Sequence, residues 1–241
     1  ENRGFGVVAY LEGTNLVAAY GVVPILHECS VEVEKGELAV IVGPNGAGKS
    51  TVMRVLLGML EATAGEVKLD GQDISTLSTQ ERISLGLAFV PQTKNVFPSM
   101  TVEENLEMGA FLRTDDIKKT MEEVYNLFPI LYEKRRQLAE ELSGGQRQQV
   151  AFGRAMMTRP SVMLLDEPTA GVSPIVMDEI FSNILDVRDA GMAVLMVEQN
   201  AQQALNIADK GYVLVSGRNE HTGTGRELIN DPEVRKKFLG G

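Results

Sequence analysis

Short apolar runs alternate with longer amphipathic segments along most of the chain. Four runs have the length of buried strands: residues 38–42, 87–90, 162–165 and 193–197. Between them, the apolar spacing predicts helices over about 49–58, 143–158 and 174–190. Apolar strands that alternate with helices are typical of a mostly parallel sheet covered on both faces, so the pattern predicts an α/β fold.

The N-terminal part of the chain has a different pattern. Over residues 9–33 apolar and polar positions roughly alternate around a break at Tyr20-Gly21, which predicts antiparallel edge strands. Residues 66–69 and 72–74 flank the turn dipeptide Asp70-Gly71 and predict a strand, turn and strand. At the other end, 212–215 predicts one more strand pair and 231–239 a last helix.

A charged helical block interrupts the alternation of strands and helices. Residues 101–141 have a helical pattern that is broken near Phe128-Pro129. Ser78-x-x-Glu81 and Thr101-x-x-Glu104 both fit the capping box, in which the side chains of the first and fourth residues satisfy each other's backbone N–H groups. We therefore expect helices to begin at both motifs, and the block to be an all-helical insertion.

Composition narrows the possible partners. The 241 residues carry a formal net charge of −10, and an acidic surface repels a polyanion, so we expect no nucleic acid partner. The single cysteine, Cys29, allows neither an intramolecular disulfide nor a two-cysteine metal site. The apolar runs fall far short of the roughly 18 residues that a membrane span needs, so we expect any membrane association to be peripheral.

The stretch GPNGAGKST at residues 43–51 follows an apolar strand and opens a helix. Its glycines let backbone N–H groups turn towards phosphate oxygens, and the helix N-terminus adds partial positive charge. Lys49 is placed to reach the β- and γ-phosphates of ATP, and the Ser50 hydroxyl to ligate Mg²⁺. The predicted nucleotide-binding residues are Gly43, Pro44, Asn45, Gly46, Ala47, Gly48, Lys49, Ser50 and Thr51.

Two carboxylates end the apolar run at 162–165. Because ligands collect beyond the carboxyl ends of parallel strands, Asp166 and Glu167 should lie near the phosphate loop. We expect Asp166 to hold Mg²⁺ through water, and Glu167 to orient and polarise the attacking water. Taken by itself the pair is equally compatible with a helix-capping role, and the phosphate loop favours the catalytic interpretation.

The pentapeptide LSGGQ at 142–146 precedes a predicted helix. A hydroxyl and exposed N–H groups at a helix N-terminus suit an anion, although Ser-Gly-Gly is also an ordinary cap and flexible turn. The residues concerned are Ser143, Gly144, Gly145 and Gln146.

In this order, the three motifs make the chain resemble the ATP-binding-cassette ATPases over nearly its whole length. The resemblance implies a P-loop NTPase fold with a mostly parallel core sheet, an antiparallel β edge subdomain and a helical insertion. It implies one cassette over residues 1–241, with the antiparallel β and RecA-like parts at about 9–92 and 143–241 and the helical subdomain at about 93–142.

The family resemblance also implies roles for single residues. Tyr20 matches the aromatic residue that stacks on adenine, and Gln92 matches the glutamine that touches Mg²⁺ or the water and senses the transmembrane partner. Gln199 takes the place of a histidine that contacts the γ-phosphate; an amide donates a hydrogen bond there but cannot become a cation. Ser173 stands where an aspartate commonly reaches the partner subunit, which implies altered contact across a dimer.

The resemblance further implies how the cassette works. Two ATPase subunits, identical or related, enclose two ATP molecules, each between one chain's phosphate loop and the other chain's residues 143–146. Transmembrane permease subunits bind the helical block, which places the cassette peripherally at the cytoplasmic face of the inner membrane. The cofactors implied are ATP and Mg²⁺, and the reaction is ATP hydrolysis coupled to transport.

Residues 197–201, 208–214 and 238–241 narrow the resemblance to the second ATPase subunit of branched-chain amino-acid importers. Three alternatives stay open at this point. They are a cassette of another transport system (urea, lipopolysaccharide or an exporter), a soluble cassette protein that acts on ribosomes or DNA, and a regulatory protein without turnover.

Overall fold

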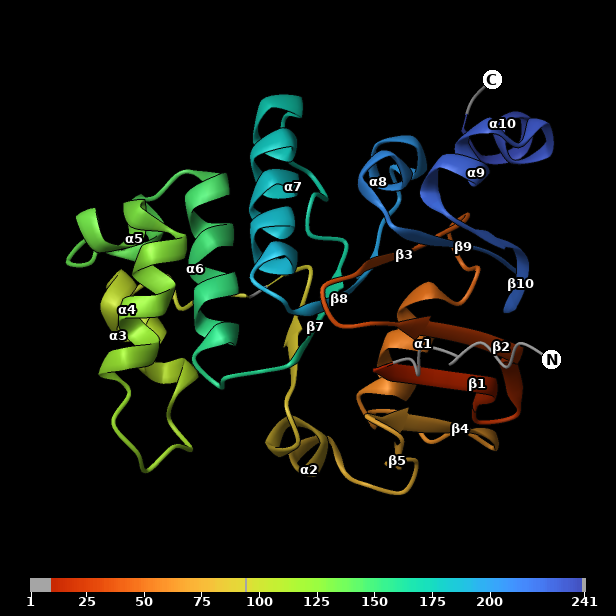
Figure 1. Cartoon of the computed structure of the whole chain (residues 1–241), viewed down its shortest axis with the longest axis horizontal. Helices are drawn as coiled ribbons and strands as arrows, with labels where there is room; N and C mark the ends of the chain where they lie inside the picture. The colour runs from red at the N-terminus through yellow and green to blue at the C-terminus, as the bar shows by residue number, and fades with distance from the viewer. Residues whose placement is uncertain (1–9, 94, 240–241) are drawn as a thin grey trace, which may run out of the picture.

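The computed structural model describes residues 10–93 and 95–239, which form two β-sheets flanked by helices (Figure 1). The predicted strand start at Ala9 and the Gly240-Gly241 end lie outside these residues. The described part has the α/β fold predicted from the alternation of apolar strands and helices.

The larger sheet has six strands in the order β10-β9-β3-β8-β7-β6. Neighbouring strands from β9 to β6 pair in parallel, and β10 pairs with β9 antiparallel. The strands are β3 (Leu38–Val42), β6 (Leu87–Val90), β7 (Val162–Asp166), β8 (Ala193–Val197), β9 (Lys210–Val215) and β10 (Arg218–Gly223). Since their carboxyl ends share one edge, the loops after β3, β7 and β8 meet there.

Alternate side chains of the parallel strands enter two separate cores. Leu38, Val40 and Val42 of β3 pack with residues of the helices on one face, whereas Ala39 and Ile41 pack on the other face. All five side chains are fully buried. A strand buried on both faces has no polar positions to alternate, which explains why the sequence shows continuous apolar runs here.

The smaller sheet is antiparallel, in the order β2-β1-β4-β5. It consists of β1 (Leu11–Tyr20), β2 (Val23–Val33), β4 (Ala64–Leu69) and β5 (Gln72–Asp73). The hairpin at Tyr20-Gly21 is as predicted, and irregularities in register interrupt the pairing of β1 with β2. Figure 1 shows α1 (Lys49–Leu56) behind this sheet, where its apolar face joins the second core.

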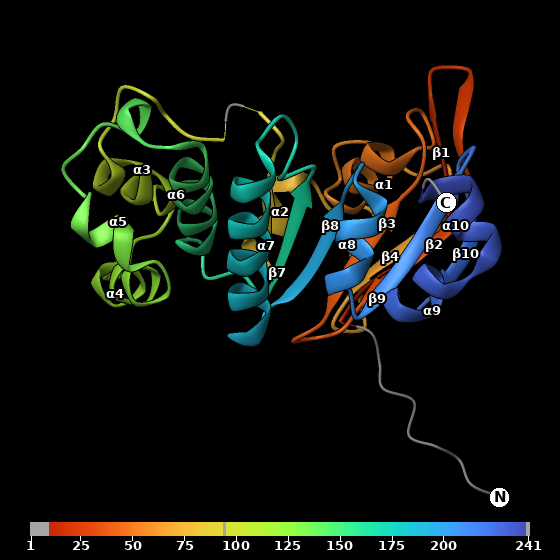
Figure 2. The same cartoon turned by 90° about the horizontal axis from the view of Figure 1, so that it is seen from above.

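The helices between β6 and β8 divide between one end of the molecule and its middle (Figure 1). Helices α3 (Val102–Gly109), α4 (Lys118–Leu127), α5 (Pro129–Glu133) and α6 (Gly144–Met156) form a helical end, with a short 3₁₀ turn, η1 (Ala139–Glu141), before α6. In Figures 1 and 2, α7 (Pro174–Asp189) lies between α6 and α1. The capping boxes predicted at Ser78 and Thr101 are both present, at the starts of α2 (Thr79–Ser84) and α3.

Three helices follow β8 and β10, and the sequence pattern predicted only the last of them, α10 (Pro232–Phe238). The other two, α8 (Ala201–Ile207) and α9 (Gly225–Asn230), were not predicted. Their caps were the available signal: the Asn200 side chain accepts from Gln203 N–H, and Thr224 forms a capping box with Glu227.

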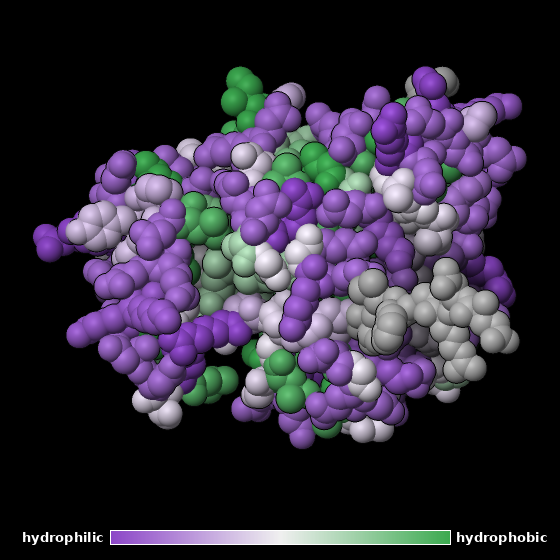
Figure 3. Space-filling model, in the orientation of Figure 1, coloured by the Kyte–Doolittle hydropathy of each residue, from purple (hydrophilic) through white to green (hydrophobic). Residues whose placement is uncertain are grey.

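Hydrophilic side chains dominate the face in Figure 3, and hydrophobic ones form small separate groups. Within residues 10–93 and 95–239, helices that are long and apolar enough to cross a membrane are absent.

Candidate functional site

The loop after β3 has the backbone of a phosphate cradle. Gly43 and Gly48 have φ values of 149° and 100°, a region that side chains with a Cβ rarely adopt. A Cβ on Gly43 would lie 2.2 Å from the backbone oxygen of Leu214, so the loop passes too close to β9 for any other residue. A cavity of about 240 Å³ opens over this loop, lined by Ile25, Asn45, Gly46, Ala47, Gly48, Lys49, Ser50, Thr51 and Glu167.

Lys49 is held under the loop. Its side chain is 5% exposed, and its Nζ donates to the backbone oxygens of Gly43 at 2.7 Å and Pro44 at 3.2 Å. Burial lowers the pKa of Lys49, while the carboxylates of Glu167, Asp166 and Glu198 raise it. Burial has the larger effect, so the pKa of Lys49 is lowered overall, and a phosphate group would offer the ammonium charged partners in place of two neutral carbonyl oxygens.

Ser50 and Asp166 meet as predicted from the two separate motifs. The Ser50 hydroxyl donates to Asp166 Oδ1 at 3.3 Å, joining the first turn of α1 to the end of β7. Burial raises the pKa of Asp166, and the Ser50 hydrogen bond with the charges of Arg54 and Lys49 opposes that rise. A hydroxyl and a carboxylate side by side are oxygen ligands of the type that Mg²⁺ takes together with nucleotide phosphates and water.

Glu167 has an unusual backbone and two amide partners. Its φ is 46°, a left-handed conformation that is uncommon outside glycine, and its N–H donates to Val197 O at 2.9 Å. The Nε2 atoms of Gln92 and Gln199 donate to the same carboxylate oxygen, Oε2, at 2.9 and 2.7 Å. Only 9% of Glu167 is exposed, so the two amides and the cavity wall fix the direction of its carboxylate.

The structure shows that Gln92 and Gln199 both contact Glu167, which the sequence did not predict. Gln92 follows β6 and Gln199 follows β8, on either side of β7, so the strand order brings both amides to Glu167. We expected Gln92 beside Mg²⁺ and Gln199 beside the γ-phosphate. In this structure both glutamines donate to Glu167 through their amide nitrogens. A metal ion would instead be ligated by the amide oxygen of Gln92.

Tyr20 lies at the end of β1 and is 43% exposed. Its hydroxyl accepts a hydrogen bond from Arg54 Nη1 at 3.1 Å. The largest apolar side chain that lines the cavity over the phosphate loop is Ile25 of β2, a residue that no sequence motif predicted. The stacking of Tyr20 on adenine stays a prediction.

Residues 143–146 begin α6, away from the phosphate loop of the same chain. Ser143 caps the helix, with Gln146 N–H donating to its Oγ at 3.2 Å and Gln146 Oε1 accepting from Ser143 N–H at 3.1 Å. A Cβ on Gly145 would lie 2.5 Å from the Glu179 carboxylate of α7, so a larger residue here would displace that side chain. Figures 1 and 2 show α7 between this helix and α1.

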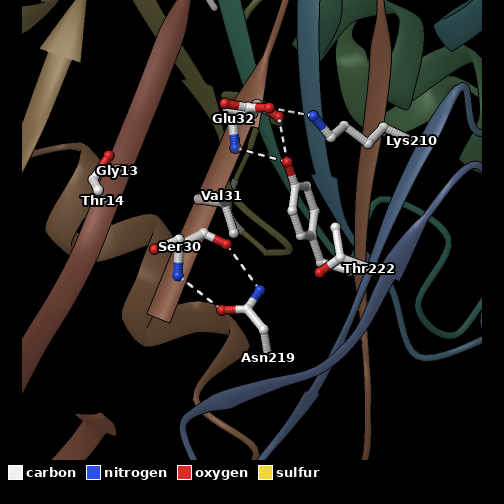
Figure 4. Close-up of a pocket in the computed structure, with 9 residues that line it drawn as sticks. Gly13, Thr14, Ser30, Val31, Glu32, Lys210, Asn219 and Thr222 are labelled. Atoms are coloured by element: carbon white, nitrogen blue, oxygen red, sulfur yellow. Dashed lines mark hydrogen bonds and ion pairs between the residues drawn. The ribbon is translucent and has the colours of Figure 1, made fainter. Parts of the chain in front are cut away.

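Another cavity, of about 470 Å³, lies between the two sheets (Figure 4). Most of its polar side chains already bind one another or the backbone. Glu32 pairs with Lys210, the Tyr212 hydroxyl bonds the N–H and C=O of Glu32, and Asn219 bonds the N–H and C=O of Ser30. These contacts hold β9 and β10 against β2, and we assign the cavity no part in the site.

The comparisons with known proteins agree with the geometry. A family model described as ABC transporter matches residues 26–170. The chain is 44% identical to the high-affinity branched-chain amino acid transport ATP-binding protein BraG of Pseudomonas aeruginosa, over 92% of this chain and 96% of the relative. It is 39% identical to the probable branched-chain amino acid transport ATP-binding protein LivF of Archaeoglobus fulgidus, over 95% and 98%.

More distant similarity extends to another transport system and to solved structures. The lipopolysaccharide export system ATP-binding protein LptB of Haemophilus influenzae is 33% identical over 97% of this chain and 98% of the relative. The crystal structure of a nucleotide-free ATP-binding cassette from an ABC transporter superposes with a TM-score of 0.86 at 30% identity, covering 97% of this chain and all of that one. The crystal structure of the ADP conformation of an ATP-binding cassette of an ABC transporter gives the same score and identity, covering 98% of this chain and 100% of that one.

Proposed function

Since this chain belongs to the ABC transporter family, as an ATP-hydrolysing subunit, we propose that Glu167 orients the attacking water and that the transporter imports branched-chain amino acids. The observation that carries the catalytic part is the convergence of Gln92 and Gln199 on Glu167 Oε2 beside the phosphate loop. The identities of 44% and 39% to amino acid transport proteins, against 33% to a lipopolysaccharide export protein, support the substrate.

The residues around the cavity fit ATP with a magnesium ion. Residues 43–51 would bind the phosphates through backbone N–H groups, and Lys49 would exchange its two carbonyl partners for phosphate oxygens. Ser50, Asp166 and the Gln92 oxygen would hold Mg²⁺, which when bound neutralises charge on the phosphates. Tyr20 would reach adenine above Ile25.

Catalysis in this arrangement is mostly positioning. Glu167 would accept a hydrogen bond from water through its carboxylate and direct the water in line with the γ-phosphate. Gln199, already 2.7 Å from Glu167, would hold the carboxylate and turn its amide N–H towards the phosphate. Neither glutamine changes charge in the reaction.

One chain supplies only part of the contacts proposed for each ATP. Residues 143–146 would bind the γ-phosphate held by a second ATPase subunit, a second copy of this chain or a related one, since α7 separates them from their own phosphate loop. Residues 93–142 would contact the permease subunits at the cytoplasmic face of the inner membrane. Closure on ATP would shift the permease because ATP binds the closed dimer better than the open one.

Substitution Glu167→Gln tests both parts of the proposal. Losing the carboxylate should lower kcat for ATP hydrolysis by about 100-fold or more, with ATP binding retained, because general-base positioning contributes about that much. In cells, the same variant should stop uptake of radiolabelled leucine, isoleucine and valine. Lys49→Ala is the contrasting control and should lose ATP binding.

Two outcomes would contradict the proposal separately. Normal phosphate release by Glu167→Gln would remove Glu167 from the reaction. Unchanged uptake of the three amino acids, together with lost ATP hydrolysis, would leave the ATPase assignment standing and remove the substrate.

A further inference from the structure

Glu198 is a buried carboxylate that the proposed reaction does not use. It directly follows β8 and is 2% exposed, with its N–H donating to Ile41 O of β3 at 3.1 Å. Burying a carboxylate is costly unless hydrogen bonds replace its water. The hydrogen-bond partners of Glu198 therefore indicate why this position holds a carboxylate.

Three donors from two loops converge on this carboxylate. Oε1 accepts from the backbone N–H of Thr169 at 3.0 Å and from the Thr169 hydroxyl at 2.7 Å. Oε2 accepts from the N–H of Gln199 at 3.1 Å. All three partners are donors, so a carboxylate, which only accepts, suits the position. A glutamine here would point its amide N–H groups at one of these donors.

The two loops that Glu198 joins both act on Glu167. Thr169 stands two residues after Glu167, in the loop 167–173 that leads from β7 to α7. Gln199 donates to Glu167 Oε2 through its side chain. The contacts therefore close a ring from Glu167 to Thr169, to Glu198, to Gln199 and back to Glu167.

The ring also supports strained backbone. Glu167 keeps a φ of 46°, a conformation that persists when the surroundings impose it. Pinning Thr169 on one side and Gln199 on the other would hold Glu167 between its two amides. Burial raises the pKa of Glu198, as does the charge of Glu167, whereas the hydrogen bonds from Thr169 and Gln199 lower it.

We propose that Glu198 is a positioning residue of ATP hydrolysis, which fixes Glu167 by tying the loop 167–173 to the loop of Gln199. This inference rests on the proposed role of Glu167. Glu198 lines no part of the cavity over the phosphate loop, and its charge has the smallest effect of the three carboxylates on the pKa of Lys49, so its removal should change the chemical step and spare ATP binding.

The test is a double-mutant cycle on the purified full chain, with kcat and KM for ATP measured by phosphate release. We expect Glu198→Ala and Thr169→Val each to lower kcat at least about tenfold, the effect of losing a hydrogen bond to a charged group, with KM within about twofold. The double variant should match Glu198→Ala, since Thr169 has then already lost its acceptor.

Two further variants separate positioning from simple loss of structure. Thr169→Ser keeps the hydroxyl and should restore kcat to within about twofold of the unchanged chain. Glu220→Gln changes an exposed carboxylate paired with Lys237 and should have no effect on kcat or KM. Thermal melts of every variant give the folded fraction by which kcat is corrected.

The inference would be overturned by an unchanged kcat in Thr169→Val, or by changes in KM that parallel those in kcat. It would also be overturned if Thr169→Ser did not restore kcat, or if the double variant lost kcat by the product of the two single effects. If Glu198→Ala does not fold, the two Thr169 variants decide the question. Normal turnover by Glu167→Gln would instead remove the proposed function itself, so the two failures are distinguishable.

Discussion

At the scale of single residues, the candidate site depends on neutral amides around one acid. Glu167 receives hydrogen bonds from two glutamines on one oxygen, and neither donor is ionisable. A histidine in place of Gln199 would introduce a group that titrates near pH 6.5. The present arrangement therefore orients the carboxylate without tying its orientation to pH.

Substitution Gln199→His should make turnover newly dependent on pH. Beside Glu167 the introduced imidazolium would pair with the carboxylate, which raises the pKa of the histidine, so the ion pair forms at low pH and is lost as pH rises. We expect kcat of the variant to change across about pH 6 to 8 relative to the unchanged chain. The measurement is the ratio of the two kcat values over that range, with Gln199→Ala as the control, and a ratio independent of pH would contradict the interpretation.

Sequence patterns predicted some of these residues because their roles are local. Lys49 and Ser50 lie in one contiguous loop, and Asp166 and Glu167 end one strand, so the rule that ligands gather at the carboxyl ends of parallel strands brought them together. The ring through Thr169 and Glu198 spans 29 positions and depends on side-chain rotamers, which no spacing reveals. Glu198 also ends a strand, and that same rule was the signal available for it.

At the scale of elements, salt bridges join the loop between α3 and α4 to the residues that follow α6. Asp115 accepts from Arg113 Nε and Nη2 at 2.8 and 2.6 Å and from Arg159 Nη1 at 3.0 Å. Both arginines also donate to the Thr120 hydroxyl. Hydrogen bonding by Arg113 is the main reason that the pKa of Asp115 falls to about 2.

Asp115→Asn should therefore destabilise the helical end in a pH-dependent way. A carboxylate with a lowered pKa adds stability above its ordinary pKa of 3.8, and this contribution is lost as pH falls towards 2. We expect the variant to melt below the unchanged chain at pH 7, with the difference shrinking as pH is lowered from about 4. The check is thermal melting followed by circular dichroism; a constant difference at every pH would show that the charge is irrelevant.

Helices and strands could be predicted where one hydrophobic pattern continued over enough residues or where a capping box marked a helix start. The parallel strands appear as continuous apolar runs because both of their faces are buried, and the capping boxes at Ser78 and Thr101 marked two helix starts. Helices α8 and α9 were missed, and both are held by packing, for example of Leu205 and Leu228 against Gly211. Tertiary contact, which a local pattern does not contain, decides such short helices.

At the scale of the whole molecule, the two segments that we propose to bind ATP phosphates do not meet within one chain. The phosphate loop opens α1 and Ser143 opens α6, with α7 between them in both views (Figures 1 and 2). One chain nevertheless carries both segments. Two copies facing each other in opposite directions would therefore complete two sites, in a closed two-fold arrangement.

This arrangement predicts how a trapped dimer should respond to substitution. Glu167→Gln with ATP should shift the chain from 26.2 kDa to twice that mass in size-exclusion chromatography with light scattering, because bound ATP is not consumed. Adding Ser143→Arg should abolish the dimer and leave ATP binding intact, since Ser143 lies away from the chain's own phosphate loop. Adding Lys49→Ala instead should abolish both ATP binding and the dimer.

Two outcomes of the Glu167→Gln, Ser143→Arg variant would contradict this arrangement. If the variant still dimerised, residues 143–146 would not form the second half of the site. If it were a monomer that no longer bound ATP, those residues would act on their own chain's nucleotide.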